Sequence, residues 1–86
     1  MGERERVTRT QIQSVVAELL TITLGRQVAQ NESISRDSES TWDSLKHVQL
    51  ILMLEEQFGI QFSEEEMGSL RDSDGIVRAV EEKNAA

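Results

Sequence analysis

The tripeptide Asp43-Ser44-Leu45 places a serine hydroxyl at the predicted start of a helix. Aspartate is a favourable N-cap because its carboxylate accepts hydrogen bonds from the first free N–H groups of a helix. Asp43 can therefore cap, which leaves Ser44 as the first helical residue with its hydroxyl free. Because a helix N-terminus carries partial positive charge and favours anions, this position suits the attachment of a phosphate ester.

The helix that must position this serine runs from Ser44 to Gly59 and has two apolar faces. A rotation of about 100° per residue predicts a core face made of His47, Leu50, Ile51, Leu54 and Phe58. The same rotation places on the side of Ser44 the residues Leu45, Val48, Gln49, Leu52, Glu55 and Glu56. A helix in a small bundle normally carries polar residues on its outer side, so the apolar strip there predicts a partner-binding surface.

The run that follows, Leu54-Glu55-Glu56-Gln57-Phe58-Gly59-Ile60, stands at a characteristic distance from Asp-Ser-Leu. With this spacing, in an acidic, cysteine-free chain of 86 residues, the sequence resembles the acyl carrier proteins and their aminoacyl and peptidyl carrier relatives. The resemblance covers about residues 8–84, and its strength lies in the combination, since the tripeptide alone is a weak signal.

The resemblance implies that Ser44 is the attachment site for 4′-phosphopantetheine from coenzyme A, with Asp43 and Leu45 beside it. The chain would then be a substrate of a phosphopantetheinyl transferase, and not an enzyme, and would carry acyl or aminoacyl groups as thioesters. The implied partners are enzymes of fatty-acid, polyketide or related biosynthesis with basic surfaces. The implied partner surface consists of Leu45, Val48, Gln49, Leu52, Glu55 and Glu56.

Three residues depart from the family pattern. Many members have glycine where Trp42 stands, and acids where Lys46 and Gln49 stand. We interpret Trp42 as a packing anchor for the end of a loop or as a contact for a particular partner. Lys46 and Gln49 weaken the negative rim near Ser44, so the usual enzymes of fatty-acid synthesis need not be the partners.

Two other interpretations stay open at this point. Ser44 could be a second N-cap residue or an ordinary surface serine. The apolar strip could instead bind a partner helix in an adaptor protein that has no prosthetic group. An enzyme is not expected, because the sequence shows no nucleophile with a neighbouring base, no acid–base pair and no metal-ligand spacing.

The length and composition predict one small domain over residues 8–84, with tails at 1–7 and 85–86. The chain has no Cys and one His, so neither a disulfide nor a metal cluster is expected, which suits a cytoplasmic protein. Neither a membrane span nor a signal peptide is expected, and we expect a monomer.

The formal charge of −7 is unevenly distributed, with ten acids and four bases from Thr41 onward. Such a field repels nucleic acid and anionic membranes and attracts basic protein surfaces. On composition alone, solubility is the more common explanation of an acidic surface.

The remaining helical patterns predict an all-α fold, a four-helix bundle of three main helices and one short one. Thr8 or Thr10 caps a first helix that runs to about Thr23 and is closed by Gly25. Its predicted apolar positions are Ile12, Val15, Val16, Leu19, Leu20 and Ile22.

Two further helices are predicted after Gly59. Ser63 and Glu66 form a capping box for a short helix to about Leu70, with Met67 and Leu70 as its buried contacts. The last helix begins at Asp72 or Ser73, and its apolar face contains Ile76, Val77 and Val80.

A long polar stretch from Leu24 to Trp42 separates the first two helices. Loops of more than about 12–15 residues are uncommon in compact domains, and are usually functional or tied down. The family resemblance implies a loop that packs across the bundle through a few apolar residues, for which Val28, Ile34 and Trp42 are the candidates.

Overall fold

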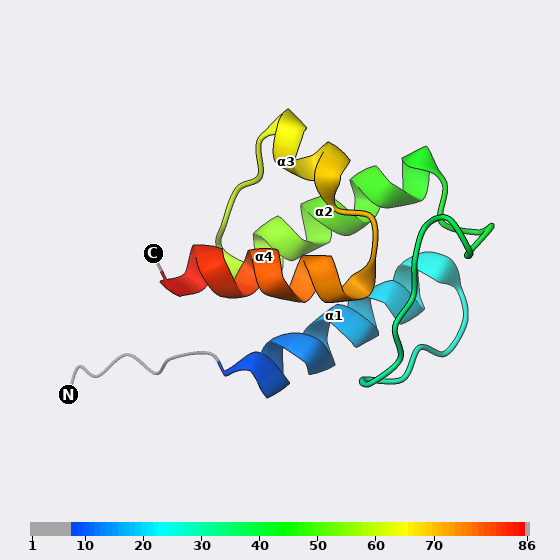
Figure 1. The fold of residues 1–86 in the computed structure, drawn as a ribbon, viewed down its shortest axis with the longest axis horizontal. Helices are drawn as coiled ribbons and strands as arrows, with labels where there is room; N and C mark the ends of the chain where they lie inside the picture. Colours follow the sequence, from blue (N-terminus) through cyan, green and yellow to red (C-terminus); the bar gives the residue numbers. More distant parts are fainter. Residues whose placement is uncertain (1–7, 86) are drawn as a thin grey trace.

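The computed structural model of the chain describes residues 8–85. This part of the chain contains no strand and four helices: α1 (Arg9–Leu24), α2 (Ser44–Phe58), α3 (Glu64–Ser69) and α4 (Ser73–Ala85) (Figure 1). For these residues, the prediction of an all-α chain with three main helices and a short one is confirmed. Of the predicted tails, residues 1–7 and 86 lie outside the described residues, whereas Ala85 belongs to α4.

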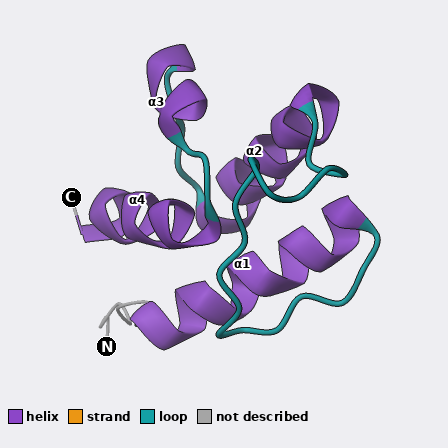
Figure 2. Cartoon of the chain, turned by 45° about the vertical axis from the view of Figure 1, so that its right-hand side comes forward, coloured by secondary structure: helices purple, strands orange, loops and turns teal. Residues whose placement is uncertain are grey.

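Helix α1 packs against both α2 and α4, whereas α3 stands to one side of this group (Figures 1 and 2). The loop of residues 25–43 runs back along α1 before it reaches α2 (Figure 2). The start of α1 and the end of α4 lie at the same end of the molecule (Figure 1), where Arg9 pairs with Glu81. The loop of residues 25–43 connects the end of α1 to Ser44 at the start of α2.

Local cap chemistry determines both ends of α1 and α2. Thr8 caps α1, and Gly25 ends it with a φ of 76°. Asp43 caps α2, and Gly59 ends it with a φ of 64°. Because only glycine adopts a positive φ at little cost, the predicted ends at both glycines are explained and confirmed.

Helix α3 begins at the predicted capping box of Ser63 and Glu66. It buries none of its own residues fully: Met67 is half-buried, and the buried Leu70 comes directly after the helix. Asp72 starts α4, since its carboxylate accepts a hydrogen bond from the backbone N–H three residues later at 2.6 Å. The short helix thus depends on its flanking residues and on polar contacts for its position.

The core is formed by α1, α2 and α4 together with residues of the loop and of the segments around α3. Its fully buried members are Ile12, Val16, Leu20, Leu50, Ile51, Leu54, Ile76 and Val80. One predicted apolar position of α1 is wrong, because Ile22 is 62% exposed. At about 100° per residue, Ile22 falls at the edge of the buried arc, on the side of the half-buried Val15, and Thr23 takes the buried place instead.

The long loop is tied down as predicted, since Val28, Ile34 and Trp42 are all buried. At two of these residues the backbone N–H is also hydrogen-bonded to a side chain. The N–H of Val28 donates to Thr21 Oγ1 at 2.9 Å, and the N–H of Ile34 donates to Ser73 Oγ at 3.0 Å. The loop is therefore held to α1 at one point and to the start of α4 at another.

Candidate functional site

Ser44 is the first residue of α2 and is exposed to solvent. Asp43 caps the helix, because its Oδ1 accepts a hydrogen bond from the Lys46 N–H at 2.9 Å. The Asp43 carbonyl accepts the first helical hydrogen bond, from the His47 N–H at 2.9 Å. Ser44 therefore has no capping role, and its hydroxyl stands free at the end of the helix.

The predicted division of α2 into two faces is confirmed. Leu50 and Leu54 are fully buried, whereas Leu45 is 68%, Val48 44% and Leu52 59% exposed. We call these three exposed residues the apolar strip. The strip begins directly beside Ser44 and continues along the helix, but its binding of a partner stays a prediction.

Three predicted partner residues meet at the C-terminal end of the strip. Leu52, Glu55 and Glu56 line an open groove, together with Gly59, Ile60 and Gln61. Gln49, between the two ends, is exposed. The predicted surface is therefore continuous from the serine to the end of α2.

Glu55 has a structural role that the sequence did not indicate. It is half-buried, and its Oε2 accepts a hydrogen bond from the Phe62 N–H at 2.8 Å. This contact depends on how the chain turns after Gly59, which periodicity does not predict. Glu56 is exposed, so it is the freer of the two acids at this end of the helix.

Trp42 and His47 form a buried pair behind the serine. Trp42 Nε1 donates a hydrogen bond to His47 Nδ1 at 3.1 Å, and the ring centroids are 6.0 Å apart. Relative to the Asp43 cap, the two residues occupy the positions of a hydrophobic staple, in which the residue before the cap contacts the fourth helical residue. This geometry favours the interpretation of Trp42 as a packing anchor, and the same spacing in the sequence was the signal that could have revealed the pair.

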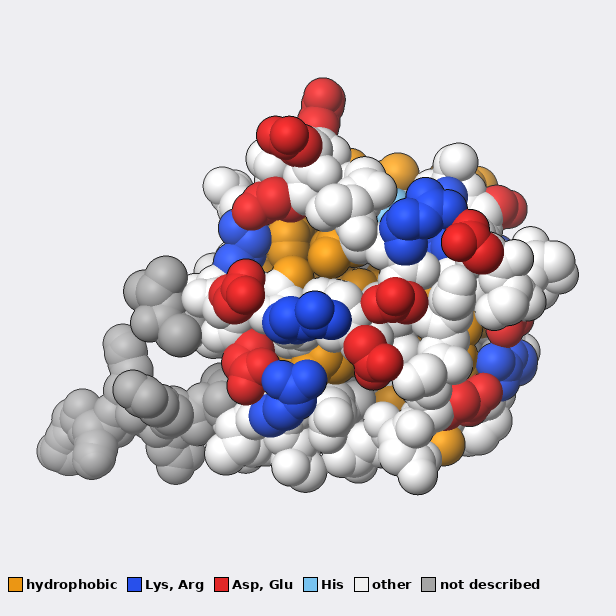
Figure 3. All heavy atoms as spheres, viewed as in Figure 1, with side chains coloured by type: hydrophobic (Ala, Val, Ile, Leu, Met, Phe, Trp, Pro, Cys, Tyr) orange, Lys and Arg blue, Asp and Glu red, His pale blue; other side chains and the backbone are white. Residues whose placement is uncertain are grey.

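The charges near the strip differ between its two ends. Lys46, beside Ser44, is half-exposed, while the acids begin with Glu55 and Glu56 and continue in the first turn of α3. Figure 3 shows acidic side chains gathered over α3, and acidic and basic ones mixed over α4. The surface next to the serine is thus apolar, with one exposed acid and one half-exposed base, Asp43 and Lys46, whereas the far end is acidic.

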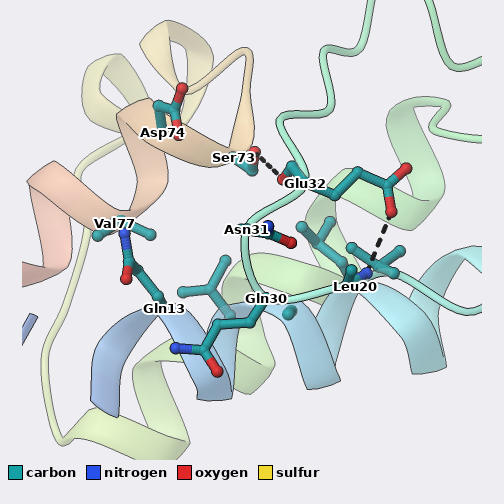
Figure 4. Close-up of a pocket in the computed structure, with 12 residues that line it drawn as sticks. Gln13, Leu20, Gln30, Asn31, Glu32, Ser73, Asp74 and Val77 are labelled. Atoms are coloured by element: carbon teal, nitrogen blue, oxygen red, sulfur yellow. Dashed lines mark hydrogen bonds between the residues drawn. The ribbon is translucent and has the colours of Figure 1, made fainter. Parts of the chain in front are cut away.

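A pocket of about 150 Å³ lies between α1, the loop and α4, and its lining contains no residue of α2. Figure 4 shows that polar groups in it are engaged with one another. Ser73 Oγ donates to the Glu32 carbonyl at 3.4 Å, and the Glu32 carboxylate accepts from the Ala29 N–H at 3.1 Å. These bonds fasten the loop, so we assign this pocket to the structure and not to the serine site.

Comparison with protein-family models, with curated proteins and with solved structures finds no match to this chain. In the part of the chain that the structure describes, no group of His, Asp and Glu side chains is arranged to hold a metal ion. None of the helices in residues 8–85 has both the length and the apolar character needed to cross a bilayer. Function is therefore inferred from the surroundings of Ser44 and from the motif that contains it.

Proposed function

We propose that this chain is a carrier protein of the acyl carrier type, with the helical fold of that family, and that Ser44 bears 4′-phosphopantetheine. The observation that carries the proposal is the exposed hydroxyl at the first position of α2, which the Asp43 cap leaves free. The Asp-Ser-Leu motif and the run from Leu54 to Ile60 support the same assignment.

The residues around Ser44 fit a phosphate ester. A helix N-terminus favours an anion, and the half-exposed Lys46 adds positive charge within the same turn. Asp43 contributes the opposite charge, but its Oδ1 is engaged with the Lys46 N–H. Asp43, Ser44 and Leu45 are all exposed, which leaves space for a bulky substituent and for the transferase that attaches it.

In the attachment step, Ser44 Oγ attacks the pantetheine-bearing phosphorus of coenzyme A. The new O–P bond forms as the P–O bond of the pyrophosphate breaks, the adenosine bisphosphate leaves, and the hydroxyl proton passes to a base. His47 cannot be this base, since it is buried and both its ring nitrogens are engaged. The transferase supplies the base, and the chain acts as substrate. When bound, the thiol of the prosthetic group would supply a thioester bond to an acyl or aminoacyl group.

The apolar strip is the proposed docking surface for the transferase and for the enzymes that load and unload the carrier. Leu45, Val48 and Leu52 would be covered by an apolar patch of the partner, and Glu56 would face a basic side chain. Asp43 and Lys46 offset each other at the edge nearest Ser44, so a neutral partner surface is favoured there. A carrier of this kind would visit separate enzymes in the cytoplasm as a monomer.

Intact-mass measurement tests the proposal. The purified chain is incubated with coenzyme A, Mg²⁺ and a broad-specificity phosphopantetheinyl transferase, and we expect a mass increase of one phosphopantetheine. Ser44→Ala should abolish this increase while the far-UV circular dichroism stays unchanged, because Asp43 still caps α2. Ser40→Ala, which removes another exposed serine before the helix, is the matched control and should be modified normally. Modification of the Ser44→Ala variant would show that the attachment site lies elsewhere.

A second candidate function is suggested by the same strip, whose three side chains are exposed without any covering segment among the described residues. An adaptor could bind an amphipathic helix there without a prosthetic group. The mass experiment separates the two, because an adaptor would not be modified by the transferase.

A further inference from the structure

A chain of buried hydrogen bonds links the long loop, α2 and α3. Trp42 Nε1 donates to His47 Nδ1 at 3.1 Å, and His47 Nε2 lies 2.8 Å from the Met67 carbonyl oxygen. Because Nδ1 accepts a hydrogen bond, the neutral ring carries its proton on Nε2 and donates it to Met67. Both ring nitrogens are thus satisfied only in this one neutral form.

This series of hydrogen bonds begins at the residue next to the N-cap of α2. Trp42 is the residue before the Asp43 cap, and its own N–H donates to the Glu39 carbonyl at 3.0 Å. At the other end, α3 buries no residue of its own fully. The bond from His47 to Met67 is therefore one of the few ties that hold α3 against α2.

The surroundings of His47 oppose a positive charge on its ring. Burial lowers the pKa of His47 from its ordinary value of 6.5, the bond to Met67 acts in the opposite direction, and the charges of Arg36 and Arg71 lower it further. Arg36 belongs to the loop, and Arg71, in the link between α3 and α4, pairs with Asp37 at 2.6 Å.

No charged side chain of α2 or α3 is hydrogen-bonded to the His47 ring, whose two nitrogens contact Trp42 and Met67. On α2, Lys46 is half-exposed, and the Asp43 cap before it accepts a hydrogen bond from the Lys46 N–H. On α3, Glu66 pairs with Lys83 of α4 at 3.0 Å. Within residues 8–85 no carboxylate is hydrogen-bonded to the imidazole, so a proton on His47 would stay unpaired.

We propose that Trp42, His47 and Met67 form an acid-sensitive latch, which protonation of His47 opens on the Trp42 side. With a proton on Nδ1, two N–H donors would face each other, and the buried indole would lose its acceptor. The bond to Met67 persists, because Nε2 donates in both protonation states. Acid would therefore release the end of the loop that leads into Asp43 and Ser44, while α3 remains attached.

The latch does not depend on the carrier function, and it is tested on the unmodified chain by NMR. One Trp and one His occur in the sequence, so the indole N–H and the imidazole C–H signals are each unique. From about pH 7.5 to about pH 5, His47 should titrate with a midpoint below the ordinary histidine value. Over the same midpoint, the exchange protection of the indole N–H, relative to a free indole at the same pH, should fall about tenfold or more, as a buried donor loses its acceptor.

Two matched variants separate the two sides of the latch. His47→Asn places an amide oxygen near the position of Nδ1, so the indole should remain protected at every pH. His47→Gln places its amide near the position of Nε2, so the indole should be poorly protected at every pH. An indole protection in the unaltered chain that stays constant through the His47 titration would overturn the proposal, and this measurement requires no variant to fold.

Discussion

Two leucines of α2 that lie two residues apart should respond in opposite ways to the same substitution. Leu54 is 0% exposed and belongs to the core, whereas Leu52 is 59% exposed and belongs to the apolar strip. The change to alanine removes the same atoms in both cases. Alanine and leucine both favour helices, so the substitutions differ mainly in what surrounds the lost atoms.

The expected magnitudes follow from burial. A fully buried Leu→Ala substitution costs about 2–5 kcal/mol, from lost transfer energy and from the cavity that remains. A chain of 86 residues has roughly 4–13 kcal/mol of stability in all, at about 0.05–0.15 kcal/mol per residue. Leu54→Ala should therefore remove a large share of the total. Leu52→Ala should cost under about 1 kcal/mol, because most of its side chain is already in water.

Denaturant and thermal unfolding of both variants measure this difference, and the transferase reaction measures its consequence. Leu54→Ala should lower the melting temperature by about 10 °C or more, at roughly 4–8 °C per kcal/mol for a domain of this size. Leu52→Ala should fold normally but be modified more slowly at Ser44. If both variants lost the same stability, the strip would be covered in solution, and the proposed docking surface would have to be given up.

The two remaining predictions concern acids and pH. Glu55→Ala should lower the free energy of unfolding by about 1–2 kcal/mol, because it leaves the Phe62 N–H without its acceptor. Glu56→Ala should change the free energy of unfolding by under about 0.5 kcal/mol. Equal changes for the two variants in chemical denaturation would contradict this prediction. Acidification should lower stability in two stages, since the lowered pKa of His47 means that the unfolded chain takes up its proton first as the pH falls below 6.5. The second stage starts only below 4.5, where protonation reaches the carboxylates whose pKa is lowered by hydrogen bonds, Glu32, Glu39 and Glu66. Melting curves of His47→Asn should lack the first stage and keep the second.

The features that sequence predicted well are those determined by neighbouring residues. The Asp43 cap and the left-handed glycine at Gly59 depend on a few consecutive positions, so the bounds of α2 could be predicted closely. The two faces of α2 follow from the helical repeat in the same way. That Ser44 has no capping role then follows from the Asp43 cap, because one residue cannot be both the cap and the first helical residue.

The features that sequence missed depend on segments far apart in the chain. His47 was correctly placed on the buried face, but its bond to Met67 requires the path of the chain after α2. The hydrogen bond of Glu55 has the same origin. Ile22 shows a different limit, since periodicity gives the direction of a side chain but not how far the neighbouring helices extend to cover it.

The arrangement of charge along α2 bears on how a partner would approach. At about 1.5 Å per residue, the apolar strip spans about 10 Å from Leu45 to Leu52, and Glu56 lies about 18 Å from Ser44 along the helix axis. At the serine end Asp43 and Lys46 offset each other, whereas Glu55 and Glu56 make the other end negative, so the two ends differ in net charge. An apolar strip alone would allow a partner to bind in either direction, whereas a difference in charge between its ends favours one direction over the other. In the favoured direction, the basic part of the proposed partner would lie over Glu56, and its active-site opening would face the Ser44 hydroxyl.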